Sequence, residues 1–280
     1  MREPPPIREA LERHGLWAKK SLGQHFLLDL NLTRRIAKSA GDLDGKPVLE
    51  IGPGPGGLTR ALLEAGADPL IVIEKDARFI PLLQELLPYS DNRLKIIEAD
   101  ALELHEEDLL AGHAAHIVSN LPYNVGTPLL IKWLKAGPWR GPMTLMFQKE
   151  VANRIAAEPR DDAYGRLSVI AQARCYVHKG MTVHAHAFTP PPKVDSAIVH
   201  LEDRTDAYPH LNDLERVTAA AFGQRRKMLR QSLASLAGEL GLPAEMLLSK
   251  AGVAPTARAE EIALQGFIAL SEAVRALRGR

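Results

Sequence analysis

The sequence has one cysteine and no long apolar run. The single cysteine, Cys175, excludes an intramolecular disulfide and a zinc site built on a CxxC pair, so we expect a reducing, cytoplasmic location. No stretch reaches the ~18 consecutive apolar residues that a transmembrane helix needs. Charged residues near the N-terminus interrupt the apolar core that a signal peptide would require. We therefore expect neither a disulfide-rich secreted protein nor a membrane protein.

Net charge is also nearly absent. The chain has 35 Lys and Arg against 34 Asp and Glu, which gives a formal charge of +1. This balance does not indicate a nucleic-acid partner, so such a partner would require locally concentrated basic residues. Hydrophobic residues make up 46% of the 280, which is enough for a globular core and excludes disorder. At ~150 residues per domain, the length predicts one large and one small domain.

Short apolar runs alternate with amphipathic stretches from residue 47 to residue 203. The predicted strands are residues 47–52, 69–74, 94–100, 115–120 and 143–148. The stretches between them repeat apolar residues every three to four positions, as helices do. This order predicts a doubly wound parallel sheet, and two later β-like runs around a TPPPK turn predict an antiparallel edge. Only helical patterns follow. The sequence thus predicts an α/β domain over residues 13–205 and a small α-helical domain over residues 206–280.

The first predicted strand runs into a glycine-rich loop. The loop matches GxGxxG at Gly52, Gly54 and Gly57. A dehydrogenase would use such a loop to bind a dinucleotide pyrophosphate and an acid about 20 residues later to bind the ribose, a condition that Glu74 meets. Pro53 and Pro55, however, have no N–H to donate. A ligand without phosphate therefore fits better, while a purely structural turn stays open.

S-adenosylmethionine is a ligand of this kind. Its ribose diol needs a carboxylate acceptor, its adenine amine needs an acidic partner, and its sulfonium tolerates nearby acids. Glu74 ends the second predicted strand and Asp100 ends the third. Because the carboxyl ends of parallel strands meet at one edge of the sheet, Glu74 is placed for the ribose and Asp100 for the adenine.

The fourth predicted strand ends in NLPYN, residues 120–124. The Asn120 side-chain oxygen, the Leu121 carbonyl and the Tyr123 ring would together hold a planar ring that bears an amine. Two acceptors would draw the amine toward tetrahedral geometry and free its lone pair, so positioning replaces a general base. The alternative is a helix-capping turn, but the position at a strand end favours the site.

Seven motifs occur in the order found in the ribosomal RNA adenine dimethyltransferases. They are GQHFLLD (23–29), EIGPGPGGLT (50–59), IEKD (73–76), EADAL (98–102), NLPYN (120–124), FTPPPKVDSAIV (188–199) and FGQRRKMLRQSL (222–233). The match covers about residues 13–278 and resembles the bacterial small-subunit enzymes most. The resemblance implies a Rossmann-like S-adenosylmethionine-dependent methyltransferase domain with a helical RNA-binding domain. It also implies dimethylation of N6 of two adjacent adenines near the 3′ end of small-subunit rRNA in the immature 30S particle, and a role in small-subunit biogenesis.

The resemblance also implies site residues. The implied cofactor contacts are His25, Leu27, Gly52, Gly54, Glu74, Asp100, Ala101 and Asn120. The implied catalytic residues are Asn120, Leu121, Tyr123 and Phe188. Phe188 would stack on the target base opposite Tyr123, although a buried core role is equally compatible with a phenylalanine. His25 departs from the asparagine that the family often has at this position.

Basic residues concentrate in two places. The first cluster is Arg225, Arg226, Lys227 and Arg230, and the second is Arg13, Lys19 and Lys20. Such runs are commonly solvated helix faces, but beside a base pocket we expect them to contact RNA phosphates, as we expect of Lys193 in the TPPPK turn. We assign His184 and His186 a structural role and expect no metal. Gly126 is expected to leave space for a methyl group beside Asn120.

Three alternatives stay open. An N6-adenine DNA methyltransferase shares the Asn-x-Pro-Tyr chemistry but carries a target-recognition domain. A large-subunit rRNA target is compatible with the same residues. A non-catalytic RNA-binding assembly factor could keep the fold, although intact Gly52, Glu74, Asp100 and Asn120 argue against it. We expect a monomer with no membrane partner.

Overall fold

The structure is a computed structural model that describes residues 4–16 and 25–278. Lys19 and Lys20 of the second basic cluster lie outside the described residues. By contacts the chain divides into two compact units. The first comprises Met1–Ala152 and His178–Glu202, and the second comprises Asn153–Val177 and Asp203–Arg280. Residues 153–177 thus group by contacts with the second unit, whereas the sequence pattern predicts them within the α/β domain of residues 13–205.

Nine strands are present in the described residues. They are β1 (Phe26–Leu27), β2 (Val48–Ile51), β3 (Leu70–Glu74), β4 (Leu94–Glu98), β5 (Ala115–Asn120), β6 (Arg140–Gln148), β7 (Cys175–Val183), β8 (Phe188–Thr189) and β9 (Ser196–Asp203). The α-helices are α1 (Ile7–Arg13), α2 (Leu30–Ser39), α3 (Gly57–Glu64), α4 (Ile80–Gln84), α5 (Gly126–Leu134), α6 (Lys149–Ala156), α7 (Arg166–Arg174), α8 (Leu211–Gly223), α9 (Leu229–Ser232), α10 (Ala234–Glu239), α11 (Ala244–Lys250) and α12 (Leu264–Arg278).

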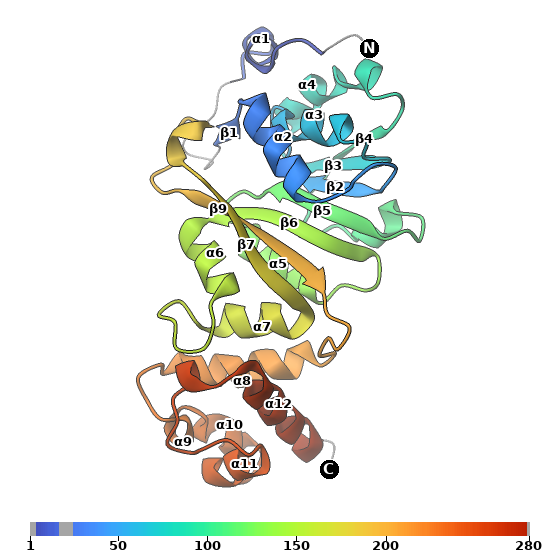
Figure 1. The fold of residues 1–280 in the computed structure, drawn as a ribbon. Helices are drawn as coiled ribbons and strands as arrows, with labels where there is room; N and C mark the ends of the chain where they lie inside the picture. Colours follow the sequence, from blue (N-terminus) through green and yellow to red (C-terminus); the bar gives the residue numbers. More distant parts are fainter. Residues whose placement is uncertain (1–3, 17–24, 279–280) are drawn as a thin grey trace. The chain divides into compact units, whose positions relative to one another are not determined.

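Seven strands form one sheet in the order β4-β3-β2-β5-β6-β9-β7. Strands β2 to β6 pair in parallel, and β9 pairs antiparallel with β6 (Figure 1). The predicted mostly parallel sheet with an antiparallel edge is confirmed. Strands β2 and β3 are buried along their whole length, as strands covered on both faces should be. The strand order reverses between β2 and its neighbours β3 and β5, and ligands bind at such a switch point in open α/β sheets.

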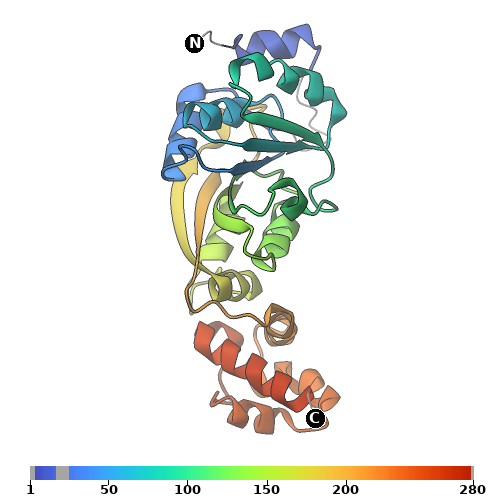
Figure 2. The same ribbon diagram turned by 90° about the vertical axis from the view of Figure 1, so that its right-hand side faces the viewer.

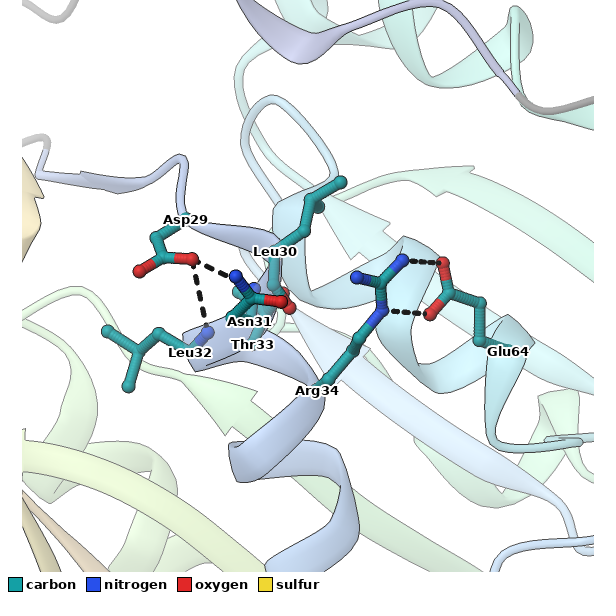
Figure 3. A network of polar contacts seen from close by, with 7 residues as sticks. All are labelled: Asp29, Leu30, Asn31, Leu32, Thr33, Arg34 and Glu64. Atoms are coloured by element: carbon teal, nitrogen blue, oxygen red, sulfur yellow. Dashed lines mark hydrogen bonds and ion pairs between the residues drawn. The ribbon is translucent and has the colours of Figure 1, made fainter.

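Helix α2 is fixed at its start and along its side (Figure 3). Asp29 caps its N-terminus by accepting hydrogen bonds from the N–H groups of Asn31 at 2.8 Å and Leu32 at 3.4 Å. Arg34 donates to both carboxylate oxygens of Glu64 in α3, at 2.6 and 3.0 Å. These contacts hold α2 beside α3, the helix that follows the glycine loop.

The second unit is mainly helical, with its C-terminal helices drawn in orange and red in Figure 2. Helix α8 contacts α7 and α12. Phe222 and Phe267 stack with ring centroids 5.4 Å apart, and the Tyr164 hydroxyl donates to the Ile262 carbonyl at 2.9 Å. This aromatic core joins α7 to the C-terminal helices, which explains why residues 153–177 belong to this unit. In the described part of the chain, no helix combines the length and apolar character needed to cross a membrane.

Candidate functional site

A cavity of about 680 Å³ lies in the first unit at the carboxyl ends of β2, β3, β4 and β5. Glu74 and Asn120 end β3 and β5, while Gly52 and Asp100 follow the ends of β2 and β4. All four residues line the cavity. The predicted cofactor and catalytic residues of this unit are all brought to it: His25, Leu27, Gly52, Gly54, Glu74, Asp100, Ala101, Asn120, Leu121, Tyr123 and Phe188. Their individual roles stay predictions.

The glycine loop donates its N–H groups inside the protein. The N–H of Gly52 bonds to the Ile73 carbonyl at 2.8 Å, that of Gly54 to Glu74 Oε2 at 3.0 Å, and that of Gly56 to the Pro53 carbonyl at 3.0 Å. The two prolines between them have none. From residue 52 to residue 56 every backbone donor is therefore engaged, so this segment offers no free N–H to a pyrophosphate.

Gly57, the last glycine of the motif, is required by packing. A Cβ at this position would lie 2.3 Å from the Leu27 carbonyl oxygen of β1. Gly52 and Gly54 have φ angles of +64° and +53°, a region that side chains rarely adopt. The glycines thus permit a tight turn against β1. The loop that contains this turn and Glu74 of β3 line the same cavity.

Glu74 is held from two sides. Its Oε2 accepts the Gly54 N–H, and its Oε1 accepts the Asp76 N–H at 2.8 Å. The pKa of this carboxyl is raised, because burial raises it more than the backbone hydrogen bonds from Asp76 and Gly54 lower it. Each oxygen keeps a further lone pair, so the oriented carboxyl can still accept from a diol.

Asp100 is paired with Lys75. The Lys75 ammonium lies 2.6 Å from Asp100 Oδ2, and the Leu102 N–H donates to Oδ1 at 2.9 Å. The hydrogen bond from Lys75 lowers the pKa of Asp100, and the Leu102 N–H lowers it further. Asp100 is therefore an ionised acceptor at neutral pH. Sequence reasoning missed Lys75, although its position directly after Glu74 made it a neighbour of the site.

Glu50 is a further carboxyl of the cavity that the sequence patterns did not indicate. It lies in β2, is 2% exposed and lines the cavity. Its Oε2 accepts a hydrogen bond from the Thr59 hydroxyl at 2.7 Å. Burial and, less strongly, the negative charge of Glu74 together raise the pKa of Glu50 to about 8, although the Thr59 hydrogen bond lowers it. The signal was an acid inside a strand that is otherwise apolar, since acids are rarely fully buried.

The NLPYN loop follows β5. The Pro122 carbonyl accepts the N–H groups of Val125 and Gly126, both at 3.1 Å, which closes the turn into α5. The Tyr123 hydroxyl shares a hydrogen bond of 2.8 Å with the Ser196 hydroxyl, and burial raises the pKa of Tyr123. Within the described ranges, no residue hydrogen-bonds to the side-chain amide of Asn120. An amide without a protein partner thus lies at the cavity.

His25 and Phe188 form another wall of the cavity. His25 Nδ1 lies 2.8 Å from the Pro190 carbonyl, which can only accept, so Nδ1 carries the proton. The other ring nitrogen is then an acceptor in the neutral side chain. The His25 ring lies 5.7 Å from the Tyr123 ring. Phe188 is 2% exposed and pairs with Leu27, so it is both a core residue and a cavity residue.

The expectation for Gly126 is wrong. A Cβ at Gly126 would lie 3.2 Å from the Phe147 ring and 3.5 Å from Leu121 Cβ. Gly126 is buried in the packing of α5 against β6, and the cavity lining includes Asn124 and Val125 but not Gly126. The missing side chain thus allows close packing of the helix and adds no space beside Asn120.

The basic residues of the second unit differ from one another. Arg225 donates to Glu260 at 3.0 Å and to the carbonyl of Asp162 at 2.7 Å, so it links segments of its own unit. The remaining three are exposed, and we call Arg226, Lys227 and Arg230 the basic cluster. Arg258, which the sequence analysis missed, pairs with Met228 across an isolated bridge and is also exposed. In the first unit, Lys193 is exposed.

His184 and His186 stack with ring centroids 5.7 Å apart, and His184 Nδ1 lies 3.1 Å from Asp195 Oδ2. Among the described residues, no group of three or more His, Cys, Asp or Glu side chains is arranged to hold a metal ion.

Two curated proteins that are similar to this chain carry the same name. "Ribosomal RNA small subunit methyltransferase A" of Phenylobacterium zucineum is 60% identical over 273 residues, which covers 96% of this chain and 92% of that protein. The protein of the same name from Maricaulis maris is 53% identical over 276 residues, which covers 97% of this chain and 96% of that protein.

Solved structures agree in fold. A dimethyladenosine transferase from Plasmodium falciparum is 27% identical with a TM-score of 0.77, covering 88% of this chain and 96% of that one. The 23S rRNA methyltransferase ErmE is 28% identical with a TM-score of 0.66, covering 89% of this chain and 99% of that one.

A family model described as "Ribosomal RNA adenine dimethylase" matches residues 15–275, which include every motif from GQHFLLD to FGQRRKMLRQSL. The similarity therefore extends over both units and over all the strand ends that line the cavity. The chain belongs to the ribosomal RNA adenine dimethylase family.

Proposed function

We propose that the chain transfers methyl groups from S-adenosylmethionine to N6 of two adjacent adenines near the 3′ end of small-subunit rRNA. The observation that carries the proposal is the amide of Asn120, which has no partner in the described residues and belongs to the residue directly before Leu121. Both are in the cavity that Glu74 and Asp100 line. Two oxygen acceptors match the two hydrogens of an adenine amine.

The cavity fits this cofactor better than a dinucleotide. Glu74 and Asp100 line it and suit a ligand with a cationic sulfonium, a ribose diol and an adenine amine. The backbone donors of residues 52–56 are already used, so a pyrophosphate would find no N–H there. Glu74 would accept from the ribose, Asp100 would accept from the adenine amine, and the acceptor nitrogen of His25 would face the methionyl end.

The chain's own residues position the nucleophile. S-adenosylmethionine supplies a methyl group on a positively charged sulfur. Asn120 Oδ1 and the Leu121 carbonyl accept the two N6 hydrogens, which draws the amine out of conjugation and turns its lone pair toward the methyl group. Tyr123 and Phe188 hold the base between their rings. The proton leaves N6 only after transfer, because the methylated amine is then the stronger acid, so no general base is required.

The RNA contacts follow from charge. The basic cluster and Lys193 would bind phosphates, as would Arg258, while Arg225 keeps a structural role through Glu260. Phosphate contacts position the RNA and carry no base specificity, so target choice depends on the shape of the particle. We propose the immature 30S particle as the substrate and a monomer as the acting form.

The test is methyl transfer to subunits that lack the modification. Small subunits from a strain without the dimethylase are incubated with the protein and S-adenosylmethionine, and digested rRNA is analysed by mass spectrometry. We expect dimethyladenine at two neighbouring positions, and none with Asn120→Ala. Large subunits and duplex DNA serve as alternative substrates in parallel.

Each outcome decides between functions. Dimethyladenine in large-subunit rRNA alone would overturn the target and favour the large-subunit alternative. Particle binding without any transfer would favour a non-catalytic assembly factor. Transfer to duplex DNA alone would favour a DNA methyltransferase.

A further inference from the structure

We propose that Lys132 is a positioning residue that fixes the turn after β4, and with it the adenine end of the cofactor, to helix α5. The turn comprises residues 100–104, and Asp100, Ala101 and Leu102 line the cavity. The identity of the ligand rests on the proposed function. The contacts that hold the turn do not depend on it.

The Lys132 ammonium has three acceptors. It donates to the Ala101 carbonyl at 2.6 Å, to the Leu104 carbonyl, and to Glu106 Oε2 at 2.8 Å. An ammonium has three N–H donors, so each is matched to one oxygen. Two of the three partners are backbone carbonyls of the turn itself, and such contacts fix backbone position directly.

Glu106 holds the ammonium in place. Its side chain is 1% exposed, and its second oxygen accepts the indole N–H of Trp133 at 2.8 Å. Both carboxylate oxygens thus have partners from α5, one from Lys132 and one from Trp133. A buried carboxylate with both oxygens bonded allows little alternative geometry, and removal of Lys132 would leave the charge of Glu106 buried and unpaired.

The turn needs an external anchor. Asp100 stabilises its start, because Oδ1 accepts the Leu102 N–H at 2.9 Å and the Asp100 carbonyl accepts the N–H groups of Glu103 and Leu104 at 3.0 and 3.1 Å. These bonds are internal to the turn and do not attach it to the rest of the protein. Lys75 attaches the start of the turn through Asp100 Oδ2 at 2.6 Å, and Lys132 attaches the rest through the carbonyls of Ala101 and Leu104.

Helix α5 is also connected to the NLPYN loop, which would bind the target base. Helix α5 begins at Gly126, whose N–H bonds to the Pro122 carbonyl within the NLPYN loop. Val125 and Leu129 on this segment also line the cavity. The Lys132 side chain of α5 therefore fixes the position of the turn at residues 100–104, which would contact the adenine of the cofactor. It fixes this turn relative to the NLPYN loop, which would bind the target base.

The experiment compares Lys132→Met with a matched control, Lys95→Met, which removes an exposed ammonium from β4. In calorimetry, Lys132→Met should bind S-adenosylmethionine about tenfold more weakly, as expected when a charged hydrogen-bond donor is lost. Lys95→Met should bind like the wild type. In kinetics, Lys132→Met should raise the KM for the cofactor more than it lowers kcat at saturating cofactor.

A second variant separates positioning from stability. In Lys132→Met combined with Glu106→Gln, no buried charge is left unpaired, so the melting temperature should recover toward the wild-type value. The cofactor affinity should stay low, because the carbonyls of Ala101 and Leu104 still lack their donor. Affinity that recovers together with the melting temperature would overturn the proposal.

Hydrogen exchange provides a test without cofactor. In the cofactor-free protein, the amides of residues 101–104 should exchange faster in Lys132→Met than in the wild type or Lys95→Met. Unchanged exchange, or cofactor binding within twofold of a wild type that binds, would overturn the positioning role. A wild type that fails to bind S-adenosylmethionine would instead overturn the proposed function, and the exchange result would still decide whether Lys132 holds the turn.

Discussion

Replacing Glu50 by glutamine should stabilise the cofactor-free protein at neutral pH. Glu50 is 2% exposed, and burial raises the pKa of its carboxyl from 4.5 to about 8. At pH 7 the folded protein therefore keeps a proton that the unfolded chain releases. Binding this proton on folding lowers the free energy of unfolding by roughly 3 kcal/mol, compared with a side chain that is neutral in both the folded and the unfolded state. Glutamine has the same shape, and its carbonyl can still accept from the Thr59 hydroxyl.

The pH dependence has a definite sign. Because the folded state binds the proton more tightly, the contribution of Glu50 to stability falls as pH rises from about 4.5 to about 8 and is constant above that. The slope in this window approaches ~1.4 kcal/mol per pH unit. Urea denaturation of the wild type and Glu50→Gln from about pH 5 to about pH 9 measures the difference, with the exposed Glu98→Gln as control. A difference that does not change with pH would refute the reasoning.

Four further outcomes are expected. Asn120→Ala should abolish methyl transfer yet keep RNA binding, as gel-shift and transfer assays would measure. Glu74→Ala should weaken cofactor binding in calorimetry by roughly 1–3 kcal/mol, because its carboxylate hydrogen bonds are lost. Alanine at all three positions of the basic cluster should lower the slope of log K against log salt by about 2–3 units, and an unchanged slope would assign the cluster to a solvated surface. Gly57→Ala should destabilise the fold by roughly 1–3 kcal/mol in urea titrations, since its Cβ would lie 2.3 Å from the Leu27 carbonyl oxygen.

The fold of the first unit was largely predictable because its strands are short, apolar and separated by amphipathic helices. The predicted strand at residues 115–120 coincides with β5, and the one at 69–74 differs from β3 by one residue. The division of the chain was harder. Residues 153–177 join the second unit through Tyr164 and its partner Ile262, which are 98 positions apart. Local patterns carry no information on which distant helix such a residue will contact.

The strand-end residues of the site were predictable for a topological reason. Parallel strands deliver their carboxyl ends to one edge, so Gly52, Glu74, Asp100 and Asn120 had to meet once the strands were assigned. The residues that hold them were not predictable in this way. Lys132 lies 28 positions from Leu104, and nothing in either segment indicates that the ammonium reaches that carbonyl. Arg225 likewise looked like its basic neighbours until its contact with Glu260 was known.

Gly126 shows why proximity in sequence does not give the direction of a side chain. It lies six positions after Asn120, and the turn closed by the Pro122 carbonyl brings both residues near the cavity. The helix that begins at Gly126, however, turns its Cβ position toward the Phe147 ring at 3.2 Å. Gly126→Val would therefore disturb the packing of α5 against β6. Space for a first methyl group has to come from residues that line the cavity, such as Asn124 and Val125. A variant that shifts the product toward monomethyladenine should be sought at those two positions.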